Sequence, residues 1–287
     1  MKVGFIGAGK VGTAMGCYFY KKGIQIVGYY SRSFPPAQQA ASWTESRVYN
    51  DLKLLASEAD LIAITTPDDT ITVVAMDLSE IPLSWKNKAV CHMSGVYASD
   101  ILSLLEQKGA TVCSLHPMLS FGDPESAVKS LESIPFTLEG KGPKLMDIKE
   151  LLKRCDNTWT EISTQNKVLY HTAACMVSNY LVTLLDMGIE MLKNAGFTEE
   201  EAKKLIEPLI RKTVDNVMNI GTVKALTGPI SRGDTGTIEK HIIKLQEYYK
   251  PWLEVYKVMG IQTVELARRE RRINEISATK IKEILKV

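Results

Sequence analysis

The feature that most constrains the fold is a glycine-rich turn after the first apolar run of the chain. Gly7, Gly9 and Gly12 follow residues 2–6 directly and open a helical pattern. In such a strand, turn and helix the first glycine permits a tight turn, the second lets a pyrophosphate approach the backbone, and the third lets helix and strand pack closely. The helix N-terminus adds unpaired N–H groups that favour a phosphate. A dinucleotide-binding domain is therefore expected, with phosphate contacts from Gly7, Gly9, Lys10, Val11 and Gly12.

The end of the second expected strand indicates which dinucleotide is bound. A carboxylate there would bind the ribose 2′-hydroxyl of NAD and would repel the 2′-phosphate of NADP. The sequence instead reads Ser31-Arg32-Ser33, without an Asp or Glu nearby. A guanidinium flanked by two hydroxyls suits a phosphate, so NADP(H) is the expected cofactor. The plain alternative is an exposed loop arginine without a ligand.

Two domains are expected from the length of the chain and from a change in its pattern. A chain of 287 residues is near the limit of what one hydrophobic core organises. Up to residue 162, short apolar runs alternate with helical segments, which is typical of a doubly wound, mostly parallel α/β sheet. Beyond that point the pattern is helical. We therefore predict a dinucleotide-binding domain over 1–162 and an all-helical domain for substrate binding and dimerisation over 163–287.

The elements of the first domain follow from these runs. The expected strands are 2–6, 24–30, 61–65, 89–93, 111–115, 136–139 and 159–162, and the expected helices include 11–22, 51–58, 100–108 and 145–154. Pro35 and Pro36 are expected to break the chain after the second strand.

A long apolar stretch, residues 165–194, begins the second domain and contains no proline. It is apolar around nearly its whole circumference, which favours a place in the middle of a helical bundle or in a subunit interface. A homodimer through the helical domain is expected from this. We find no uncharged window of membrane-spanning length and no leader pattern, so a cytoplasmic protein without a membrane partner is expected.

Charge and cysteine content exclude other classes of partner. The formal net charge of +2 is too small to imply nucleic acid. The five cysteines are scattered and form no C-x-x-C pair, which argues against a disulfide framework. Ligand spacing for zinc is also absent, so no metal site is expected.

Ligands of open α/β sheets bind at the carboxyl ends of the strands. Thr66, Pro67 and Asp68 follow one expected strand and should line the cofactor. Ser94, with His92 before it, and His116 follow the next two and place polar groups on the same rim. Either imidazole could instead be structural and bonded to a loop carbonyl.

The long helix and a later loop supply further candidates. Lys167 and His171 lie on one helical stripe, with Asn179 near its edge. A solvated first helical turn is the alternative. Residues 226–234 are rich in turn formers, and Arg232 within them could clamp a carboxylate, although a simple helix connection would read the same.

Several of these stretches together resemble a family of two-domain NADP-binding proteins that includes an alternative type of ketopantoate reductase. They are GFIGAGKVG, YYSRS, DLIAITTPDD, CHMSGV, SLHPMLSF, KVLYHTAACMVSN and ALTGPISRGD. More distantly, the chain is similar to the superfamily of 6-phosphogluconate and pyrroline-5-carboxylate reductases. In several of those proteins an asparagine follows the lysine by one turn, whereas here that position is His171.

The resemblance implies NADPH-dependent reduction of a small 2-oxo acid, most plainly ketopantoate to pantoate. Charge that develops on the carbonyl oxygen needs a protonated donor, for which Lys167 is the first candidate and His171 the second. Ser94 and Asn179 would hold the carbonyl or hydroxyl group, and Arg232 would pair with the carboxylate. Two alternatives remain open: an imine reductase of the pyrroline-5-carboxylate type, and a non-catalytic NADP sensor.

Overall fold

The computed structural model describes residues 1–269 and 271–286. Packing divides the chain into two compact units, Met1–Tyr180 and Leu181–Val287. The last strand, β8 (Trp159–Glu161), ends next to the boundary that the sequence predicts after residue 162. The helix that follows, α8 (Lys167–Val177), still packs with the first unit.

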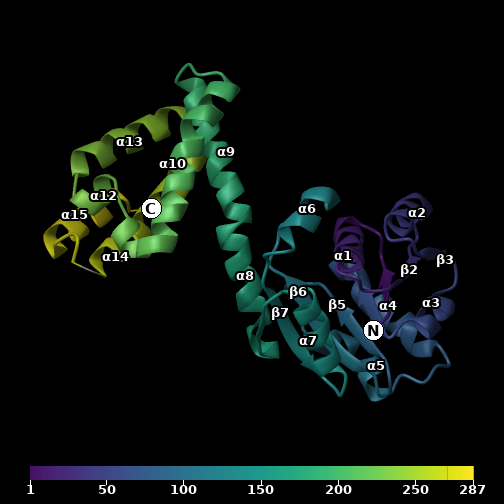
Figure 1. The fold of residues 1–287 in the computed structure, drawn as a ribbon. Helices are drawn as coiled ribbons and strands as arrows, with labels where there is room; N and C mark the ends of the chain where they lie inside the picture. The colour runs from purple at the N-terminus through teal and green to yellow at the C-terminus, as the bar shows by residue number, and fades with distance from the viewer. Residues whose placement is uncertain (270, 287) are drawn as a thin grey trace. The chain divides into compact units, whose positions relative to one another are not determined.

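One eight-stranded sheet organises the first unit, in the order β3-β2-β1-β4-β5-β6-β7-β8 (Figure 1). All neighbouring strands are parallel except β6 and β7, which confirms the doubly wound, mostly parallel sheet. The other strands are β1 (Val3–Ile6), β2 (Ile26–Tyr30), β3 (Arg47–Tyr49), β4 (Leu61–Ile64), β5 (Ala89–His92), β6 (Thr111–Pro117) and β7 (Phe136–Lys141).

Two local expectations were wrong. The strand β3 was not predicted, because its three residues are too short for a period to show. Pro35 and Pro36 do not break the chain but lie in the first turn of α2 (Phe34–Trp43). A proline is tolerated there because the first N–H groups of a helix have no partner within it.

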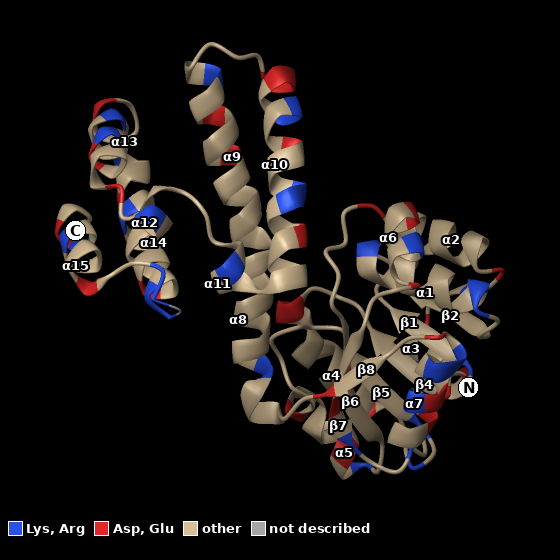
Figure 2. Ribbon diagram, turned by 60° about the vertical axis from the view of Figure 1, so that its left-hand side comes forward, with Lys and Arg blue, Asp and Glu red and all other residues tan. Residues whose placement is uncertain are grey.

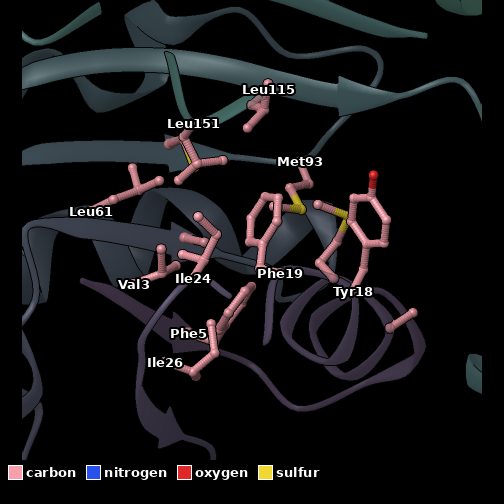
Figure 3. Packing of buried hydrophobic residues seen from close by; sticks show 14 of the residues in the cluster. Val3, Phe5, Tyr18, Phe19, Ile24, Ile26, Leu61, Met93, Leu115 and Leu151 are labelled. Carbon is pink, nitrogen blue, oxygen red and sulfur yellow. The ribbon is translucent and has the colours of Figure 1, made fainter. Parts of the chain in front are cut away.

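Helices cover both faces of this sheet. One face carries α1 (Lys10–Lys21), α2, α6 (Pro124–Ser130) and α7 (Leu145–Arg154), and the other carries α3 (Leu52–Glu58), α4 (Ile71–Glu80) and α5 (Ser103–Gln107). In β4, Leu61 and Ala63 join the first core cluster, whereas Ile62 and Ile64 join the second. Burial on both faces explains why such strands are continuously apolar. Figure 3 shows the first cluster, with Phe5 and Phe19 at its centre.

All regular secondary structure in the described part of the second unit is helical. Its helices are α9 (Asn179–Asn194), α10 (Glu199–Ile220), α11 (Thr222–Ala225), α12 (Pro229–Arg232), α13 (Thr235–Tyr248), α14 (Lys250–Arg268) and α15 (Glu275–Ile284). A small core joins the last four, formed by Ile230, Ile238, Val264, Ala267, Ile273, Ala278, Ile281 and Leu285.

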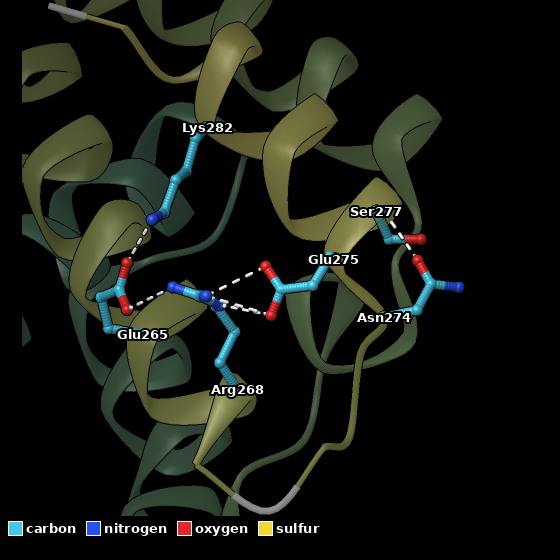
Figure 4. Close-up of polar contacts among 6 residues, drawn as sticks. All are labelled: Glu265, Arg268, Asn274, Glu275, Ser277 and Lys282. Carbon is cyan, nitrogen blue, oxygen red and sulfur yellow. Dashed lines mark hydrogen bonds and ion pairs between the residues drawn. The ribbon is translucent and has the colours of Figure 1, made fainter.

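Polar contacts also tie α14 to α15 in the second unit (Figure 4). Arg268 pairs with Glu265 on its own helix and with Glu275 on α15, at 3.1 and 2.9 Å. The side chain of Asn274 accepts from the backbone N–H of Ser277 at 2.8 Å, and so caps α15.

The long apolar stretch forms helix from Thr164 to Asn194, interrupted only at Ser178. By length and composition this helix could cross a membrane. The expectation that no such window exists was therefore wrong, because residues 168–185 contain no Asp, Glu, Lys or Arg. Helices at the core of soluble proteins meet the same criterion, so the criterion alone does not assign the helix to a membrane.

The same stretch is not the centre of a bundle within the chain. Val177 is 74% exposed and Val182 is 67% exposed. In Figure 2, α9 and α10 lie side by side, and the first charged residue of α9 is Asp186, so that residues 179–185 are all uncharged. The sequence predicted either the middle of a helical bundle or a subunit interface for this stretch. Of these two places, the exposure of its side chains is compatible only with the subunit interface.

Candidate active site

The turn between β1 and α1 has the geometry that its three glycines predict. Gly7 has a φ of +105°, and a Cβ there would lie 2.8 Å from the carbonyl group of Thr65. A Cβ on Gly12 would lie 2.2 Å from the carbonyl oxygen of Gly7. A Cβ on Gly9, in contrast, would have no heavy atom within 4 Å. Two of the glycines are thus required by packing, and the third borders open space.

The N-terminus of α1 opens beside Gly9. The helix begins at Lys10, so the N–H groups of Lys10, Val11 and Gly12 have no acceptor within the helix. These groups, together with the partial positive charge of the helix N-terminus, suit an anion such as a pyrophosphate.

The loop after β2 lies next to this turn. Strands β1 and β2 are parallel neighbours, with Ile6 opposite Tyr30, and the N–H of Gly7 donates to the carbonyl oxygen of Tyr30 at 2.8 Å. Ser31, Arg32 and Ser33 follow Tyr30, and the side chain of Arg32 is exposed. The guanidinium is therefore free to meet a phosphate beside the glycine turn.

The loop after β4 forms the other side of the turn. Thr65 donates its hydroxyl hydrogen to the carbonyl oxygen of Gly7 at 2.8 Å. The hydroxyl of Thr66 is buried and has no hydrogen-bond partner among the described residues. Asp68, beyond Pro67, accepts a hydrogen bond from the hydroxyl of Ser94 at 2.9 Å. An orphaned hydroxyl at this edge is the kind of group that a polar ligand satisfies.

Lys167 lies against β6 and the loop that follows β5, and it is only 1% exposed. Its Nζ donates to the carbonyl oxygen of Ser94 at 3.1 Å and to the hydroxyl of Ser114 at 2.8 Å. Burial lowers the pKa of Lys167 to about 8, and the carboxylates of Glu139 and Asp68 oppose this shift. The sequence pointed to Lys167, but as a group facing a cleft and not as a buried one.

Glu139 is a buried carboxylate that the sequence analysis missed. It accepts hydrogen bonds from the N–H of Ser99 at 2.6 Å, from the hydroxyl of Ser99 at 2.9 Å and from Thr164 at 2.9 Å. The bonds from Ser99 tie β7 to the segment that follows β5, and the bond from Thr164 ties β7 to the segment that leads into α8. The only sequence signal was a single acidic residue within an apolar strand.

Two histidines of the rim have different surroundings. His92 is fully buried, its Nε2 lies 3.0 Å from the carbonyl oxygen of Ala98, and its Nδ1 accepts from the N–H of Ser94. His92 is thus a structural imidazole bonded to a loop carbonyl, which the sequence analysis gave as the alternative to a role at the site. His116 instead bonds through Nδ1 to the hydroxyl of Tyr170 at 2.8 Å, a partner that sequence reasoning missed. Burial lowers the pKa of His116 to about 4, and the charge of Lys167 acts in the same direction.

His171 completes this cluster from α8. Its ring is perpendicular to that of His116, with 6.5 Å between the ring centroids. Its Nε2 lies 3.6 Å from the sulfur of Cys175. Its Nδ1 is buried, with no hydrogen-bond partner in the part of the chain that the structure describes.

Two further candidate residues, Asn179 and Arg232, make no hydrogen bond to the cluster among the described contacts. Asn179 is exposed at the first residue of α9 and makes none of the hydrogen bonds above. Arg232 is exposed at the end of α12 in the second unit. Their roles stay predictions. Within residues 1–269 and 271–286, no group of three or more His, Cys, Asp or Glu side chains could hold a metal ion.

Two family models match the chain. A Rossmann-like domain matches residues 1–117, and a domain of unknown function, DUF2520, matches residues 134–263. No curated protein matches the chain.

Solved structures match it along nearly the whole length. A Thermotoga maritima protein is 25% identical, with a TM-score of 0.73 over 94% of this chain and 99% of its own. A Bacteroides fragilis protein, provisionally described as an NADP oxidoreductase, is 21% identical, with a TM-score of 0.71 over 98% of each chain. A Plasmodium falciparum pyrroline carboxylate reductase with NADP bound is 16% identical, with a TM-score of 0.62 over 100% of this chain and 98% of its own. The last two similarities show the fold alone.

The sheet, the glycine turn and the helical second unit define a two-domain protein of the Rossmann type. The chain thus matches a Rossmann-like model in its N-terminal part and the DUF2520 model in its C-terminal part, the combination that its resemblance led us to expect.

Proposed function

We propose that this protein is an NADPH-dependent reductase of a small 2-oxo acid, with ketopantoate as the first substrate to test. The observation that carries the proposal is the open space beside Gly9, at the N-terminus of α1 and next to the exposed Arg32. A buried ammonium and two imidazoles stand at the ends of the neighbouring strands.

The residues around the turn fit NADP(H). The N–H groups at the start of α1 would hold the pyrophosphate, and Ser31, Arg32 and Ser33 would hold the 2′-phosphate. Thr66, Pro67 and Asp68 would line the nicotinamide half, where the orphaned hydroxyl of Thr66 needs a polar partner. The Bacteroides and Plasmodium proteins, whose names include NADP, share this fold.

The groups at the strand ends fit the reduction of a carbonyl. Bound NADPH supplies the hydride, so a 2-oxo acid, NADPH and one proton give a 2-hydroxy acid and NADP⁺. The ammonium of Lys167 donates to the carbonyl oxygen of Ser94, and its positive charge would stabilise negative charge that develops on a nearby carbonyl oxygen of the substrate. Lys167 or His171 would supply the proton, Ser94 and Asn179 would hold the carbonyl or hydroxyl groups of the substrate, and Arg232 would bind its carboxylate.

A panel of oxo acids and imines tests this function. NADPH absorbance would be followed with ketopantoate, pyruvate, 2-oxobutanoate and pyrroline-5-carboxylate, each repeated with NADH. We expect turnover of an oxo acid with a preference for NADPH. Arg32→Ala should reduce that preference roughly tenfold to a hundredfold, because one charge-assisted contact is lost. Tight NADPH binding without oxidation by any member of the panel would contradict the proposal and indicate a sensor.

A second candidate is an imine reductase. Similarity to the Plasmodium pyrroline carboxylate reductase along the whole chain favours it. The buried ammonium of Lys167 argues for the oxo acid instead, because a protonated imine would be repelled by it. Turnover of pyrroline-5-carboxylate at a kcat/KM above that of every oxo acid would select the imine reductase.

Assembly belongs to the same proposal. We expect a cytoplasmic homodimer in which a second copy covers the exposed apolar side chains of α9 and α10. Three of these side chains are Val182, Leu209 and Met218, which are 67%, 67% and 78% exposed. Large exposed apolar side chains that lie together on a protein surface commonly mark a site of interaction with another molecule.

A further inference from the structure

The two histidines of the strand-end cluster converge on one glycine. If Gly95 carried a Cβ, this atom would lie 2.5 Å from Nδ1 of His171 and 3.0 Å from Nε2 of His116. Because both distances are measured from one point, the two ring nitrogens lie no more than about 5.5 Å apart, a span that one oxygen atom bridges with two hydrogen bonds. Gly95 thus marks a place where two imidazole nitrogens come together.

The hydrogen bonds of Tyr170 determine which ring nitrogen of His116 carries a proton, and so whether Nε2 donates or accepts near Gly95. The hydroxyl of Tyr170 lies 2.8 Å from Nδ1 of His116 and 3.5 Å from the sulfur of Met118. It has one proton to give, and a thioether is a weak acceptor, so the proton goes to Nδ1. A neutral imidazole that accepts at Nδ1 carries its own proton at Nε2. The N–H of His116 is then on the side of Gly95.

His171 offers the complementary atom. Its Nδ1 is buried and lacks a partner among the described residues, although buried polar atoms are nearly always hydrogen-bonded. A hydroxyl oxygen placed beside Gly95 satisfies both rings at once. It accepts from Nε2 of His116 and donates to Nδ1 of His171.

We propose that His116 and His171 bind the reacting oxygen of the substrate beside Gly95, and that Tyr170 is the positioning residue that fixes the His116 proton on Nε2. This inference rests on the proposed function only in naming that oxygen. As the carbonyl of the oxo acid it accepts from Nε2 of His116, and after a proton has arrived from Lys167 or His171 it donates, as the product hydroxyl, to Nδ1 of His171. The neutral state of His116 supports it, since a neutral imidazole donates a hydrogen bond without surrendering its proton. Lys167, bonded to Ser94 and Ser114, acts from below through its charge.

Histidine-detected NMR tests the tautomer without substrate. The chain has four histidines, so each ring is resolved as a separate pattern in a ¹H–¹⁵N correlation of the labelled full-length protein. We expect the proton of His116 on Nε2, and we expect the Nδ1 resonance to move in Tyr170→Phe. A proton on Nδ1, or an Nδ1 resonance that Tyr170→Phe leaves in place, would overturn the positioning role.

The second unit provides a matched control. His241 pairs through Nδ1 with Tyr256 at 2.9 Å, with the rings at 86°, close to the 87° of His116 and Tyr170. Tyr256→Phe should move the resonances of His241 and leave those of His116 unchanged. This control separates the loss of a hydroxyl from a general effect of the substitution.

Pantoate added with NADPH tests the binding of the oxygen, because a hydroxy acid and the reduced cofactor cannot react together. We expect the resonances of His116 and His171 to move, while those of His92 and His241 stay. In kinetics, Tyr170→Phe should lower kcat/KM for the oxo acid roughly tenfold, with an unchanged Kd for NADPH. His116→Phe should lower it roughly a hundredfold.

Two results separate this inference from the proposed function. Unmoved His116 and His171 resonances in a protein that oxidises NADPH with oxo acids would sink the inference and leave the function standing. Absence of NADPH binding would remove the function, and the tautomer in wild type and in Tyr170→Phe would still decide the role of Tyr170.

Discussion

The two units of this chain differ in how completely they bury their apolar side chains. In the first unit the sheet residues of β4 are fully buried between helices on both faces. In the second unit a core of eight buried residues serves four helices, while Leu209 and Met218 on α10 are 67% and 78% exposed.

This difference separates two sources of stability. A sheet covered on both faces satisfies its own backbone and buries its own side chains, so the first unit draws its stability from its own two core clusters. Helices with exposed apolar faces gain most of their stability from whatever covers those faces. We therefore expect substitutions in the first unit to act on folding and cofactor binding, and substitutions on α9 and α10 to act on assembly.

The largest effect is expected at Gly12. A methyl group there would meet the backbone oxygen of Gly7 at 2.2 Å and the hydroxyl of Thr65 at 2.4 Å. Gly12→Ala should lower the free energy of unfolding by about 2–4 kcal/mol and abolish NADPH binding, because helix and strand are forced apart. Thermal unfolding and NADPH fluorescence measure the two effects.

Gly9→Ala is the matched control for this prediction. Its methyl group enters open space, so stability should change by less than about 0.5 kcal/mol. NADPH binding should still weaken at least tenfold, because the methyl group occupies the approach of the pyrophosphate. Equal loss of stability in both variants would show that the glycine turn is held by something other than this packing.

The next effect concerns the buried charge of Lys167. Its pKa is about 8 in the folded chain and 10.5 when unperturbed, so the unfolded chain binds more protons between these pH values. The free energy of unfolding of the wild type, relative to Lys167→Met, should therefore rise from pH 8 to pH 10.5, by up to about 3 kcal/mol. Urea unfolding across this range measures it.

Ser114→Ala serves as the control here, because it removes an acceptor of the ammonium and leaves the amine buried. It should keep the pH dependence that Lys167→Met removes. If the difference in unfolding free energy between the wild type and Lys167→Met does not change with pH, the ammonium of Lys167 is not desolvated in the way that its burial indicates.

A smaller effect is expected on assembly. Leu209→Gln and Met218→Gln should each raise the dissociation constant of the homodimer at least tenfold, about 1.4 kcal/mol, by placing an amide in an apolar interface. Sedimentation velocity measures it. Met146→Gln, on a methionine of the first unit that is 66% exposed, should leave the dimer intact. A wild-type protein that is monomeric without detergent, or that needs detergent for solubility, would contradict the dimer.

The smallest effect is expected within the second unit itself. Asn274→Ala removes the cap of α15 and should cost about 1 kcal/mol of unfolding free energy. Chemical unfolding followed by the fluorescence of Trp252, which stacks on Tyr249 in this unit, measures it. An unchanged midpoint would mean that α15 is held by its apolar contacts alone.

Sequence reasoning succeeded where local pattern and final environment agree. The strands buried on both faces and the glycine turn could be predicted, because each depends on residues close together in the chain. The strand β3 could not be predicted, because three residues are too few to show a pattern and the segment is a strand only through its pairing with β2. The partner of His116 escaped for a related reason, because Tyr170 lies 54 residues away and meets it only through the fold.

The depth of Lys167 also makes this amine a natural reporter of local opening. Amine-reactive reagents modify exposed lysines quickly, whereas Lys167 can react only when α8 moves away from Ser94 and Ser114. The rate at which Lys167 is labelled, compared by mass spectrometry with the rates of the other lysines, therefore measures how often this part of the protein opens locally.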